Sequence, residues 1–474
     1  MHAMVGHVVA LDFGATSGRV ILGEVGPNQL RTATHARFTN RPVRVRGCLQ
    51  WNVLSLWQGA LDGLSSALRE VPTVSSVATD TWGVDYGMLR GGELLGNPRH
   101  YRDERTSSIV GEVQSRASAA SQYSTTGIQF MPINTIYQLA VDAADNRLEL
   151  ADTVLLMPDL FTYWLSGVRI AETTMASTTG MLNVHTQQWS DDLIAVAGAR
   201  PGLFPDLVMP GTRIGKLDPD VARQVRAESP IEVVAVGSHD TASAVTAIPM
   251  QSESAAFISC GTWGLAGVEL ENAVVTDEAR VGGFTNEVGV DGRILLMRNV
   301  MGLWILSEAV RQWEREGDTI GLPELIAAAA AVEKEMPVVD VDDSRFLAPG
   351  NMPERIVEWC GERGIRAPTT RAEMARCIIE SLAQAFADAV LSAGSLSNVP
   401  VRTIHIVGGG SLNQLLCQRT ADRSGIPVLA GPVEATALGS VLVQARAMGH
   451  ISGGLDTLRD LVRRTHHPVS YSPR

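Results

Sequence analysis

Short apolar runs that end in polar or glycine residues alternate with helical patterns along the chain, which predicts an α/β fold. Val8–Leu11 is rich in β-branched residues and runs into Asp12, and Val20–Val25 has the same character beyond a glycine-containing turn. We expect these two runs to pair as a β-hairpin at the start of the first domain.

A helix and two further strands are predicted in the first half of the chain. Leucine and tryptophan recur there at spacings of three and four residues, as on one face of a helix. These positions are Leu54, Trp57, Leu61, Leu64 and Leu68. Val74–Thr79 then predicts a strand that ends at Asp80, and Ile231–Val236 predicts one that runs into a polar turn.

The second half of the chain repeats this order. Ala255–Ser259 opens another predicted hairpin, and Arg371–Ala393 has the pattern of a long helix. Thr403–Val407 predicts a strand that leads into three consecutive glycines. The repeat indicates two related α/β domains, which we place at residues 1–246 and 247–474.

The composition is that of a packed globular protein. Of the 474 residues, 45% are hydrophobic and 19% are charged, and the formal net charge is −12. Nucleic-acid binding requires clustered Lys and Arg, so we expect no nucleic-acid partner. The first residues lack the basic start of a secretory signal, and no apolar stretch reaches the roughly 18 residues of a membrane helix. We therefore expect a cytoplasmic protein without a membrane partner.

The five cysteines are few and are not spaced as metal ligands. They are Cys48, Cys260, Cys360, Cys377 and Cys417. Reduced thiols are expected in the cytoplasm. A bond between Cys360 and Cys377 remains open if the fold brings the two residues together.

Asp12–Arg19 has the composition of a phosphate-binding turn. Glycines allow a phosphate to approach the backbone, while hydroxyl and N–H groups can donate to it. Asp12, at the end of the first strand, can hold Mg²⁺ through water, because this ion binds few carboxylates and keeps several waters. An ordinary hairpin turn with a surface aspartate is the alternative.

Thr79–Tyr86 contains two carboxylates, a hydroxyl and two aromatic side chains around a glycine. Asp80 and Asp85 can accept hydrogen bonds from sugar hydroxyls, and the face of Trp82 can cover C–H groups. Arg102 adds a cation to a second polar and aromatic segment downstream. The segment therefore suits a sugar, and the alternative is a strand-end loop with a core tryptophan.

Gly237–Ser243 follows a predicted strand and precedes an alanine-rich, predicted helical stretch. In α/β enzymes such a turn presents reactive groups. Asp240 can serve there as a general base for a sugar hydroxyl, or it can be a helix N-cap. In the second domain, Ser259–Trp263 and Gly408–Asn413 are small-residue loops suited to a nucleotide, although the glycine run can also be a flexible turn.

Together these segments resemble the FGGY family of carbohydrate kinases, which belongs with actin, hexokinase and the heat-shock chaperone ATPases. The resemblance covers nearly the whole chain, and DTWGVD, HDTASAV and AGPVEATALG occur in the family's order. It implies a two-lobed actin-like ATPase (ribonuclease H-like) fold with the active site in the interlobe cleft. It also implies a monomeric or small oligomeric enzyme that uses ATP and Mg²⁺ to phosphorylate a ketose sugar.

The resemblance implies roles for individual residues. Asp240 would be the catalytic base and Asp12 would lie near the metal. The sugar would be bound by Gly83, His239, Asp240 and Thr241, together with Trp82, Asp85 and Arg102. ATP would be bound by Ala15, Thr16, Ser17, Gly18, Arg19, Thr262, Asn299, Gly409 and Gly410.

One departure from the family pattern and several alternatives remain at this stage. Ser307 stands where relatives can carry a glutamine near the nucleotide, which leaves the base preference open. The sequence does not fix which ketose is the substrate, and L-fuculose and L-xylulose are among the alternatives. Pocket shape discriminates one methyl group by only about 1–3 kcal/mol. A non-catalytic ATP-binding protein would not need Asp12 and Asp240, and a chaperone-like ATPase would need a further peptide-binding domain.

Overall fold

The computed structural model describes residues 5–474, which form two compact units. Unit 1 comprises the described residues up to Pro249, Leu270–Leu296 and Ala435–His466, and unit 2 comprises Met250–Glu269, Met297–Glu434 and His467–Arg474. Our domain division after residue 246 follows sequence order, whereas these units follow packing, so that division stays a prediction.

Unit 1 is built on a six-stranded sheet with the order β14-β15-β6-β1-β2-β3. The strands are β1 (Gly6–Phe13), β2 (Ser17–Gly26), β3 (Gln29–Thr39), β6 (Ser76–Thr81), β14 (Arg213–Lys216) and β15 (Glu232–Val234). β1, β2 and β3 form an antiparallel meander, β6 and β15 run parallel to β1, and β14 closes the edge in the antiparallel sense. The predicted hairpin and the two predicted strands are confirmed.

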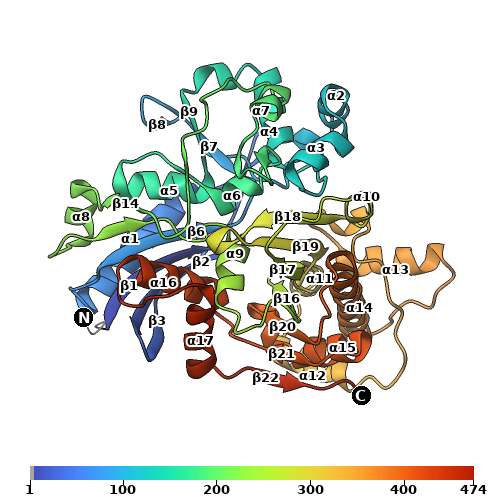
Figure 1. The fold of residues 1–474 in the computed structure, drawn as a ribbon. Helices are drawn as coiled ribbons and strands as arrows, with labels where there is room; N and C mark the ends of the chain where they lie inside the picture. The colour runs from blue at the N-terminus through green and yellow to red at the C-terminus, as the bar shows by residue number, and fades with distance from the viewer. Residues whose placement is uncertain (1–4) are drawn as a thin grey trace. The chain divides into compact units, whose positions relative to one another are not determined.

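Helices cover both faces of this sheet, as Figure 1 shows. On one face, α1 (Val53–Glu70) lies over β2 and β3, and α5 (Met157–Ser166) packs an aromatic ring of Phe161 against Phe13 at a centroid distance of 4.6 Å. On the other face, α16 (Ala435–Ala447) packs against β1, β2 and β6. Gln444 of α16 accepts a hydrogen bond from Ser76 of β6 at 2.9 Å.

The predicted helix over residues 54–68 is confirmed, but its buried face differs from the predicted one. Leu56, Leu61, Leu64 and Leu68 are buried against the sheet, whereas Leu54 is 63% exposed. Leu54 precedes Leu56 by two positions, which places it about 200° away around the helix axis. The Leu54 side chain therefore lies on the solvent side of the first turn.

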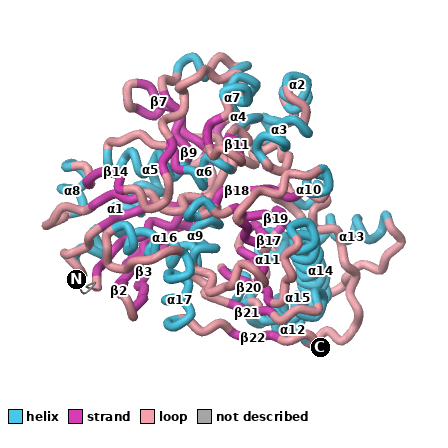
Figure 2. The backbone as a smooth tube through the Cα atoms, viewed as in Figure 1, coloured by secondary structure: helices cyan, strands magenta, loops and turns pink. Residues whose placement is uncertain are grey.

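The remainder of unit 1 has a core of its own, which includes Tyr86, Tyr137, Val154 and Met175. A three-stranded sheet β8-β7-β9 and several short helices surround this core, and Figure 2 shows their alternation with loops. The strands are β7 (Tyr86–Arg90), β8 (Glu93–Leu94), β9 (Thr153–Leu156), β10 (Ala171–Glu172), β11 (Leu182–Asn183), β12 (Gln188–Trp189), β13 (Leu207–Val208) and β18 (Phe284–Val288). The helices are α2 (Val110–Arg116), α3 (Ala119–Thr126), α4 (Thr135–Ala144), α6 (Thr173–Ser177), α7 (Asp191–Val196) and α10 (Asp277–Val281).

Other elements of unit 1 lie outside this second core. They are β4 (Val43–Val45), β5 (Cys48–Gln50), α8 (Pro219–Val225), α9 (Asp240–Thr246) and α17 (Leu455–Thr465). α9 packs on α16 at very short range, because Gly439 of α16 lies against the backbone of Ser243. A Cβ atom on Gly439 would be only 1.8 Å from the Ser243 carbonyl oxygen, so this position requires glycine.

Unit 2 repeats the strand order of unit 1. Its strands are β16 (Ala255–Cys260), β17 (Trp263–Leu270), β19 (Ile294–Met301), β20 (Thr403–Val407), β21 (Val428–Ala430) and β22 (Val469–Tyr471). β16 pairs antiparallel with β17 and parallel with β20, β21 runs parallel to β20, and β22 closes the edge antiparallel. The second predicted hairpin, the long helix and the strand before the glycine run are confirmed.

The helices of unit 2 are α11 (Trp304–Arg315), α12 (Leu322–Ala330), α13 (Met352–Glu362), α14 (Arg371–Ser397) and α15 (Gln414–Ser424). α14 has the length and composition of a membrane span, contrary to our expectation that no segment would. However, 72% of its apolar window is buried inside the fold. Met374, Ile378, Phe386 and Val390 belong to this buried face, as expected of a core helix.

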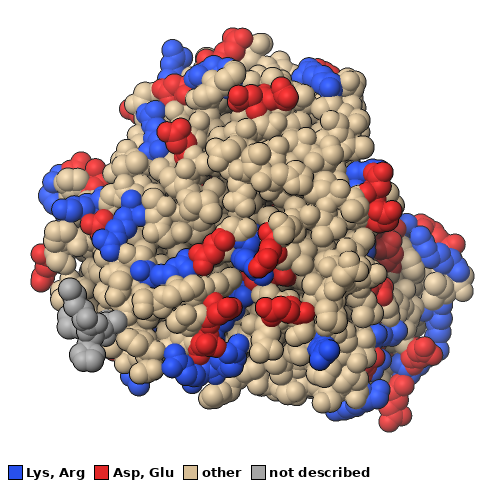
Figure 3. Space-filling model, in the orientation of Figure 1, with Lys and Arg blue, Asp and Glu red and all other residues tan. Residues whose placement is uncertain are grey.

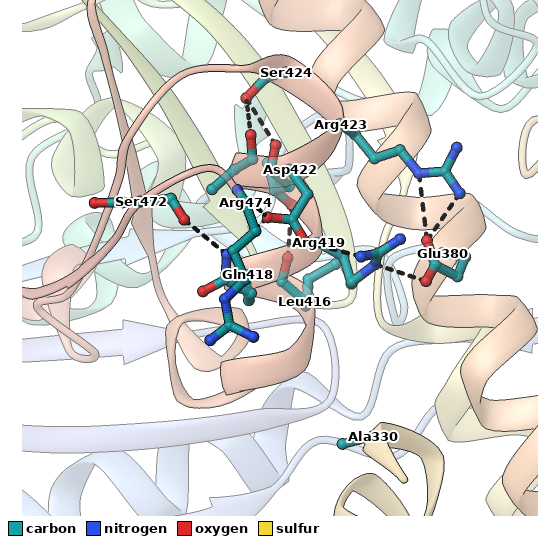
Figure 4. Close-up of polar contacts among 12 residues, drawn as sticks. Ala330, Glu380, Leu416, Gln418, Arg419, Asp422, Arg423, Ser424, Ser472 and Arg474 are labelled. Atoms are coloured by element: carbon teal, nitrogen blue, oxygen red, sulfur yellow. Dashed lines mark hydrogen bonds and ion pairs between the residues drawn. The ribbon is translucent and has the colours of Figure 1, made fainter. Parts of the chain in front are cut away.

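A charged cluster fixes α15 against α14 (Figure 4). The Glu380 carboxylate of α14 is 2.7 Å from Arg419 and 2.9 Å from Arg423, both on α15, and Arg376 lies 2.8 Å away on α14 itself. Burial alone would raise the pKa of Glu380, but hydrogen bonds from these arginines lower it. α15 follows the glycine run directly, so the cluster also anchors that loop.

The charges on the drawn surface are mixed in sign, and the thiols are free. On the face drawn in Figure 3, Lys and Arg lie interspersed with Asp and Glu. All five cysteines are free, and four of them, Cys260, Cys360, Cys377 and Cys417, are buried. The bond between Cys360 and Cys377 that the sequence left open is therefore not formed.

Candidate active site

Two buried carboxylates lie side by side on neighbouring strands of unit 1. Asp12 of β1 and Asp80 of β6 are direct partners in the parallel register. Such partners place their side chains on the same face of a sheet, one strand spacing of about 4.8 Å apart. Asp12 is 2% exposed and Asp80 is fully buried. The hydroxyl of Ser440, on α16, stabilises the charged form of Asp80.

The two carboxylates interact unfavourably with each other and with a third. Burial raises the pKa of Asp80 well above its ordinary value of 3.8, and the charges of Asp12 and Asp240 raise it further. Burial also raises the pKa of Asp12, although Arg19, 3.5 Å from its carboxylate, opposes the rise. Neither oxygen of Asp80 accepts a hydrogen bond of normal geometry from the described residues. Such a group favours a proton or a cation between the carboxylates.

Asp240 is the first residue of α9 and follows the loop Gly237–His239. The backbone N–H of Thr81 donates to the carbonyl of Ser238 at 2.9 Å, which holds this loop at the end of β6. His239 occupies the N-cap position, so the N-cap alternative for Asp240 is wrong. The Asp240 side chain is 33% exposed. Burial raises its pKa, and the neighbouring imidazole of His239 opposes that rise.

The turn between β1 and β2 is fixed by a residue from outside the hairpin. The side chain of Asn40 donates to the carbonyl of Gly14 at 2.9 Å, and its backbone N–H donates to the carbonyl of Thr16 at 3.0 Å. Thr16 is exposed, whereas Ala15 and Ser17 are half-buried. The turn therefore presents a hydroxyl group and backbone on a rigid frame, as a phosphate site requires.

Gly18 and Arg19 have structural partners in addition to the roles predicted for them. A Cβ atom on Gly18 would lie 2.3 Å from the ring of Phe38, so packing alone requires glycine there. Arg19 is the cross-strand partner of Asp12 in the hairpin register. Its guanidinium is therefore held beside the strand-end carboxylates, where it can meet an anionic ligand.

Asp85 organises an aromatic cluster on the sugar segment. Its Oδ2 accepts hydrogen bonds from the indoles of Trp51 at 2.6 Å and Trp82 at 3.0 Å, and Gln138 donates to Oδ1 at 2.9 Å. The two indole rings lie 4.0 Å apart, and His100 stacks on Trp51 at 3.9 Å. Burial raises the pKa of Asp85 to about 6, with these hydrogen bonds opposing the rise.

This arrangement gives Asp85 a supporting position. The residue is fully buried, so its known partners are protein groups, and its direct contact with a sugar stays a prediction. Trp82 is 5% exposed and lies in the same cluster. Arg102 lies over the ring of Tyr101 at 5.3 Å, and its backbone N–H donates to Nδ1 of His100 at 3.0 Å. Burial, reinforced by Arg102, lowers the pKa of His100 to about 3.

The backbone beside Gly83 is strained. Val84 has φ 68°, a region that β-branched residues rarely adopt. Thr178 accepts a hydrogen bond from its N–H at 3.2 Å, and Thr135 donates to its carbonyl at 2.7 Å, so neighbouring segments impose the conformation. A Cβ atom on Gly83 would lie 3.2 Å from the Thr178 hydroxyl. Strain that is held in this way is typical of ligand sites.

In unit 2, the two predicted nucleotide loops are in contact. Gly408 has φ 78°, and a Cβ atom there would be 2.9 Å from the carbonyl oxygen of Cys260. A Cβ atom on Gly410 would be 2.3 Å from the sulfur of the same cysteine. Gly409, between them, is exposed and faces open space. Packing therefore requires glycine at positions 408 and 410, whereas Gly409 leaves room for a ligand.

Thr262 and Asn299, which are also predicted to bind ATP, lie in unit 2 with the glycine run. Thr262 is half-buried in the turn between β16 and β17, and its carbonyl accepts from the N–H of Trp304 at 3.2 Å. Asn299 is half-buried on β19. Ser307 is exposed on α11, three residues into that helix. These residues share one unit with the glycine run, whereas all the predicted sugar residues lie in unit 1.

Three site residues have positions or contacts that the sequence patterns do not predict. Asp80 was grouped with the sugar segment, but its charge acts on Asp12 and Asp240; the shared strand-end position of Asp12 and Asp80 was the available signal. Trp51, in the aromatic cluster, stands alone before a helix in the sequence. Glu287, 2.8 Å from His239, lies on β18, where no local pattern marks it.

The strand-end residues fit a divalent cation. Within residues 5–474, no three His, Cys, Asp or Glu side chains form a complete metal site. Mg²⁺ does not need one, because it binds through one or two carboxylates together with waters and substrate phosphates. Burial raises the pKa of both Asp12 and Asp80, and the charge of Asp12 raises that of Asp80 further, so a cation beside them would favour their charged forms.

The strand order, repeated in both units, is that of the two-domain actin-like ATPase fold, with its carboxylates at strand ends. The chain belongs to the FGGY family of carbohydrate kinases: the family's N-terminal domain matches residues 7–247 and its C-terminal domain matches residues 256–448. It is therefore a sugar kinase whose phosphate donor is ATP.

Relatives and solved structures agree over nearly the whole chain. A rhamnulokinase from Bacteroides thetaiotaomicron is 40% identical, covering 97% of this chain and 95% of the relative. A rhamnulokinase from Pectobacterium carotovorum subsp. carotovorum is 39% identical, covering 99% and 93%. Among solved structures, a ligand-bound xylulose kinase from Lactobacillus acidophilus has a TM-score of 0.79 at 17% identity, covering 99% of this chain and 94% of that one. The latter similarity concerns the fold.

Proposed function

We propose that this protein phosphorylates L-rhamnulose at O1 with ATP, giving L-rhamnulose 1-phosphate and ADP, and that it acts in L-rhamnose degradation in the cytoplasm. The observation that carries the proposal is the 40% identity, over 97% of the chain, to a relative named rhamnulokinase. The position of Asp240 at the start of α9 supports it, because this carboxylate is partly exposed near two buried ones whose pKa it affects.

In the proposed reaction, Asp240 takes the proton of the sugar O1 hydroxyl as that oxygen attacks the γ-phosphorus of ATP. The new O1–P bond forms while the bond from phosphorus to the bridging oxygen breaks, and the electron pair leaves on ADP. Asp12 would hold Mg²⁺ through water, with Asp80 beside it, and the ion would neutralise charge on the phosphate oxygens. Arg19 would contribute a fixed positive charge nearby.

The remaining residues bind and orient the substrates in this proposal. Gly83, His239 and Thr241 contact the sugar, and the cluster around Trp82, Asp85 and Arg102 forms its surroundings. Ala15, Thr16, Ser17 and Gly18 contact the phosphates. Thr262, Asn299, Gly409 and Gly410 contact the rest of the nucleotide. Phosphoryl transfer depends mainly on such positioning and charge neutralisation, since the protein forms no covalent intermediate.

A coupled ADP-release assay over a panel of ketoses, with Mg²⁺ and ATP, tests the proposal. We expect L-rhamnulose to give the highest kcat/KM, above L-fuculose and L-xylulose. Phosphorus NMR of the product would establish the position of the ester. Asp240→Asn protein, purified in the same way, controls for a contaminating kinase. Faster turnover of glycerol or D-xylulose would overturn the sugar assignment and leave the family assignment intact.

A further inference from the structure

His239 lies between two carboxylates in unit 1. Its Nδ1 is 2.8 Å from Oε2 of Glu287, and its Nε2 is 3.5 Å from Oδ1 of Asp240. The side chains of Glu287 and His239 are each 8% exposed, whereas Asp240 is 33% exposed. The three groups therefore form a line from a buried carboxylate to the partly exposed proposed base.

The backbone around Glu287 is fixed on both sides. The N–H of Asn286 donates to the carbonyl of Gly127 at 2.8 Å, and the N–H of Val288 donates to the hydroxyl of Ser177 at 3.0 Å. All five residues of β18 are buried. These contacts fix the backbone from which the buried Glu287 side chain reaches His239.

The backbone of His239 is fixed as well. Its N–H donates to the hydroxyl of Thr174 at 3.2 Å, and Thr174 itself donates to Glu172 at 2.5 Å. Glu172 is fully buried and also accepts from the N–H of Ser238 at 3.1 Å. Thus the loop before α9 is held by one buried glutamate, and the His239 ring is held by another, Glu287.

Charge explains why the imidazole needs a carboxylate on its far side. A neutral imidazole can donate from one nitrogen only, whereas both nitrogens of His239 face carboxylates. Burial alone would lower the pKa of His239, but Glu287 and, to a smaller extent, Asp240 and Glu172 together outweigh burial and raise it to about 9. His239 therefore carries a positive charge at neutral pH, and each of its ring nitrogens lies within ion-pair distance of a carboxylate.

The contacts of Asp240 are concentrated on one of its oxygens. Nε2 of His239 and the hydroxyl of Thr241, 3.2 Å away, both approach Oδ1. These two side-chain donors, with a hydrogen bond from the Thr241 backbone, orient the carboxylate, and its 33% exposure lets it take a proton from a sugar hydroxyl. Loss of the imidazole's orientation would release one of the two donors.

We infer that Glu287 is a positioning residue for phosphoryl transfer, which acts through His239 to hold the Asp240 carboxylate in its productive orientation. This inference rests on the proposed function, because it assigns Asp240 as the base. It requires no contact between Glu287 and the substrates. Small displacements of a reacting group can cost about 10²-fold in rate, so an effect of about 10- to 100-fold is expected.

The test compares Glu287→Gln and Glu287→Asp in the full-length protein with Mg²⁺–ATP and L-rhamnulose. Gln keeps the size of the side chain and removes its charge, whereas Asp keeps the charge and leaves a small cavity. If Glu287 acts through its charge, the Glu287→Asp variant should retain more kcat than Glu287→Gln, with KM for ATP unchanged. If Glu287 only fills space, this order should reverse, and that result would overturn the inference.

Two further measurements separate positioning from general damage. The Nδ1–H proton of His239, followed by NMR of protein with ¹⁵N-labelled histidine, should move upfield in Glu287→Gln as its ionic partner disappears. In a His239→Gln background, Glu287→Gln should have no additional effect on kcat, because the intermediary is absent. An undiminished effect of Glu287→Gln in that background would also overturn the inference.

A control substitution and the wild-type protein complete the design. Glu269→Gln alters another buried glutamate, one that accepts from Ser252 at 2.6 Å at the far end of β17, and it should keep wild-type turnover. If wild-type protein turned over no sugar, the proposed function would fail and the inference with it. If wild type were active and Glu287→Gln stayed within twofold of it, the inference alone would fail. If Glu287→Gln does not fold, the kcat of Glu287→Asp and the chemical shift of its His239 Nδ1–H proton still test the inference.

Discussion

The sheets of unit 1 and unit 2 share one strand order but differ in what stands at the strand ends. In unit 1, the register places Asp12 beside Asp80. In unit 2, Ser259 pairs with Val407, so the next residues, Cys260 and Gly408, stand at the corresponding ends. The comparison shows that the repeated fold supplies two similar frames, and that charge is concentrated on one of them while the other is shaped by small residues.

The difference also appears in how the two hairpin turns are held. In unit 1, the turn is held by the side chain of Asn40, and its Thr16 is exposed. In unit 2, the turn is held by backbone, since the N–H of Leu303 donates to the carbonyl of Gly261 at 3.0 Å. A polar, charged site suits proton transfer and metal binding, whereas a backbone-lined loop suits close contact with a nucleotide.

The largest expected effect comes from the proposed base in unit 1. Asp240→Asn should lower kcat by about 10²–10⁴-fold while ATP affinity stays nearly unchanged. Asparagine has almost the same shape and can still accept hydrogen bonds, but it cannot take the proton. Steady-state kinetics and direct ATP titration measure the two quantities separately. Turnover near the wild-type rate would remove Asp240 from the chemistry.

The next effect concerns Asp12, a strand-end carboxylate of unit 1. Asp12→Asn should raise the Mg²⁺ concentration needed for half-maximal rate by about 10-fold, because it removes charge beside the proposed metal position. Kinetic titration of Mg²⁺ at saturating sugar would measure this. If excess Mg²⁺ restored none of the lost kcat, that result would contradict a role for Asp12 near the metal.

A pair of neighbouring glycines tests the claim that unit 2 is shaped by packing. Gly410→Ala should destabilise the protein by about 1–3 kcal/mol, because the new methyl group would overlap the Cys260 side chain. Gly409→Ala is the matched variant, since its methyl group would enter open space. We expect Gly409→Ala to keep stability and to raise KM for ATP. Denaturant unfolding and ATP kinetics distinguish these outcomes, and equal stability of both variants would break the comparison.

The smallest expected effect concerns stability and its dependence on pH. The pKa of Asp80 is raised in the fold, so its ionisation costs stability as pH rises above 3.8, the ordinary value. Asp80→Asn should therefore stabilise the metal-free protein at pH 8 by on the order of 1 kcal/mol, as expected for a carboxylate that is buried and also lies near like charges. The gain should shrink as pH falls towards 4. Unfolding curves at several pH values would show it, and a loss of stability at pH 8 would contradict the mutual repulsion.

The sequence predicted the local parts of this molecule well. The hairpins and the long helix were predicted because alternation and helical spacing are local properties, and the strand Thr403–Val407 was predicted to the residue. The buried face of α1 was partly wrong, since Leu54 in the first turn points to solvent. Family resemblance, rather than periodicity, supplied the residue roles.

The contacts that unite the site could not be predicted from local pattern. Glu287 and His239 are separated by 47 intervening residues and meet only because β18 and the loop before α9 are each fixed by other segments. Likewise, Trp51 reaches Asp85 across 34 positions. Such contacts depend on which faces pack together, and one sequence contains no direct signal of that.

The aromatic cluster around Asp85 has a practical consequence for observing the protein. Trp51 and Trp82 are held 4.0 Å apart at an interplanar angle of 35°, and both indoles bond to one carboxylate. Rings fixed in a chiral, packed environment produce near-ultraviolet circular dichroism, which is lost when tertiary packing loosens. These two of the chain's nine tryptophans should therefore contribute to that signal, and loosening of this cluster should reduce it.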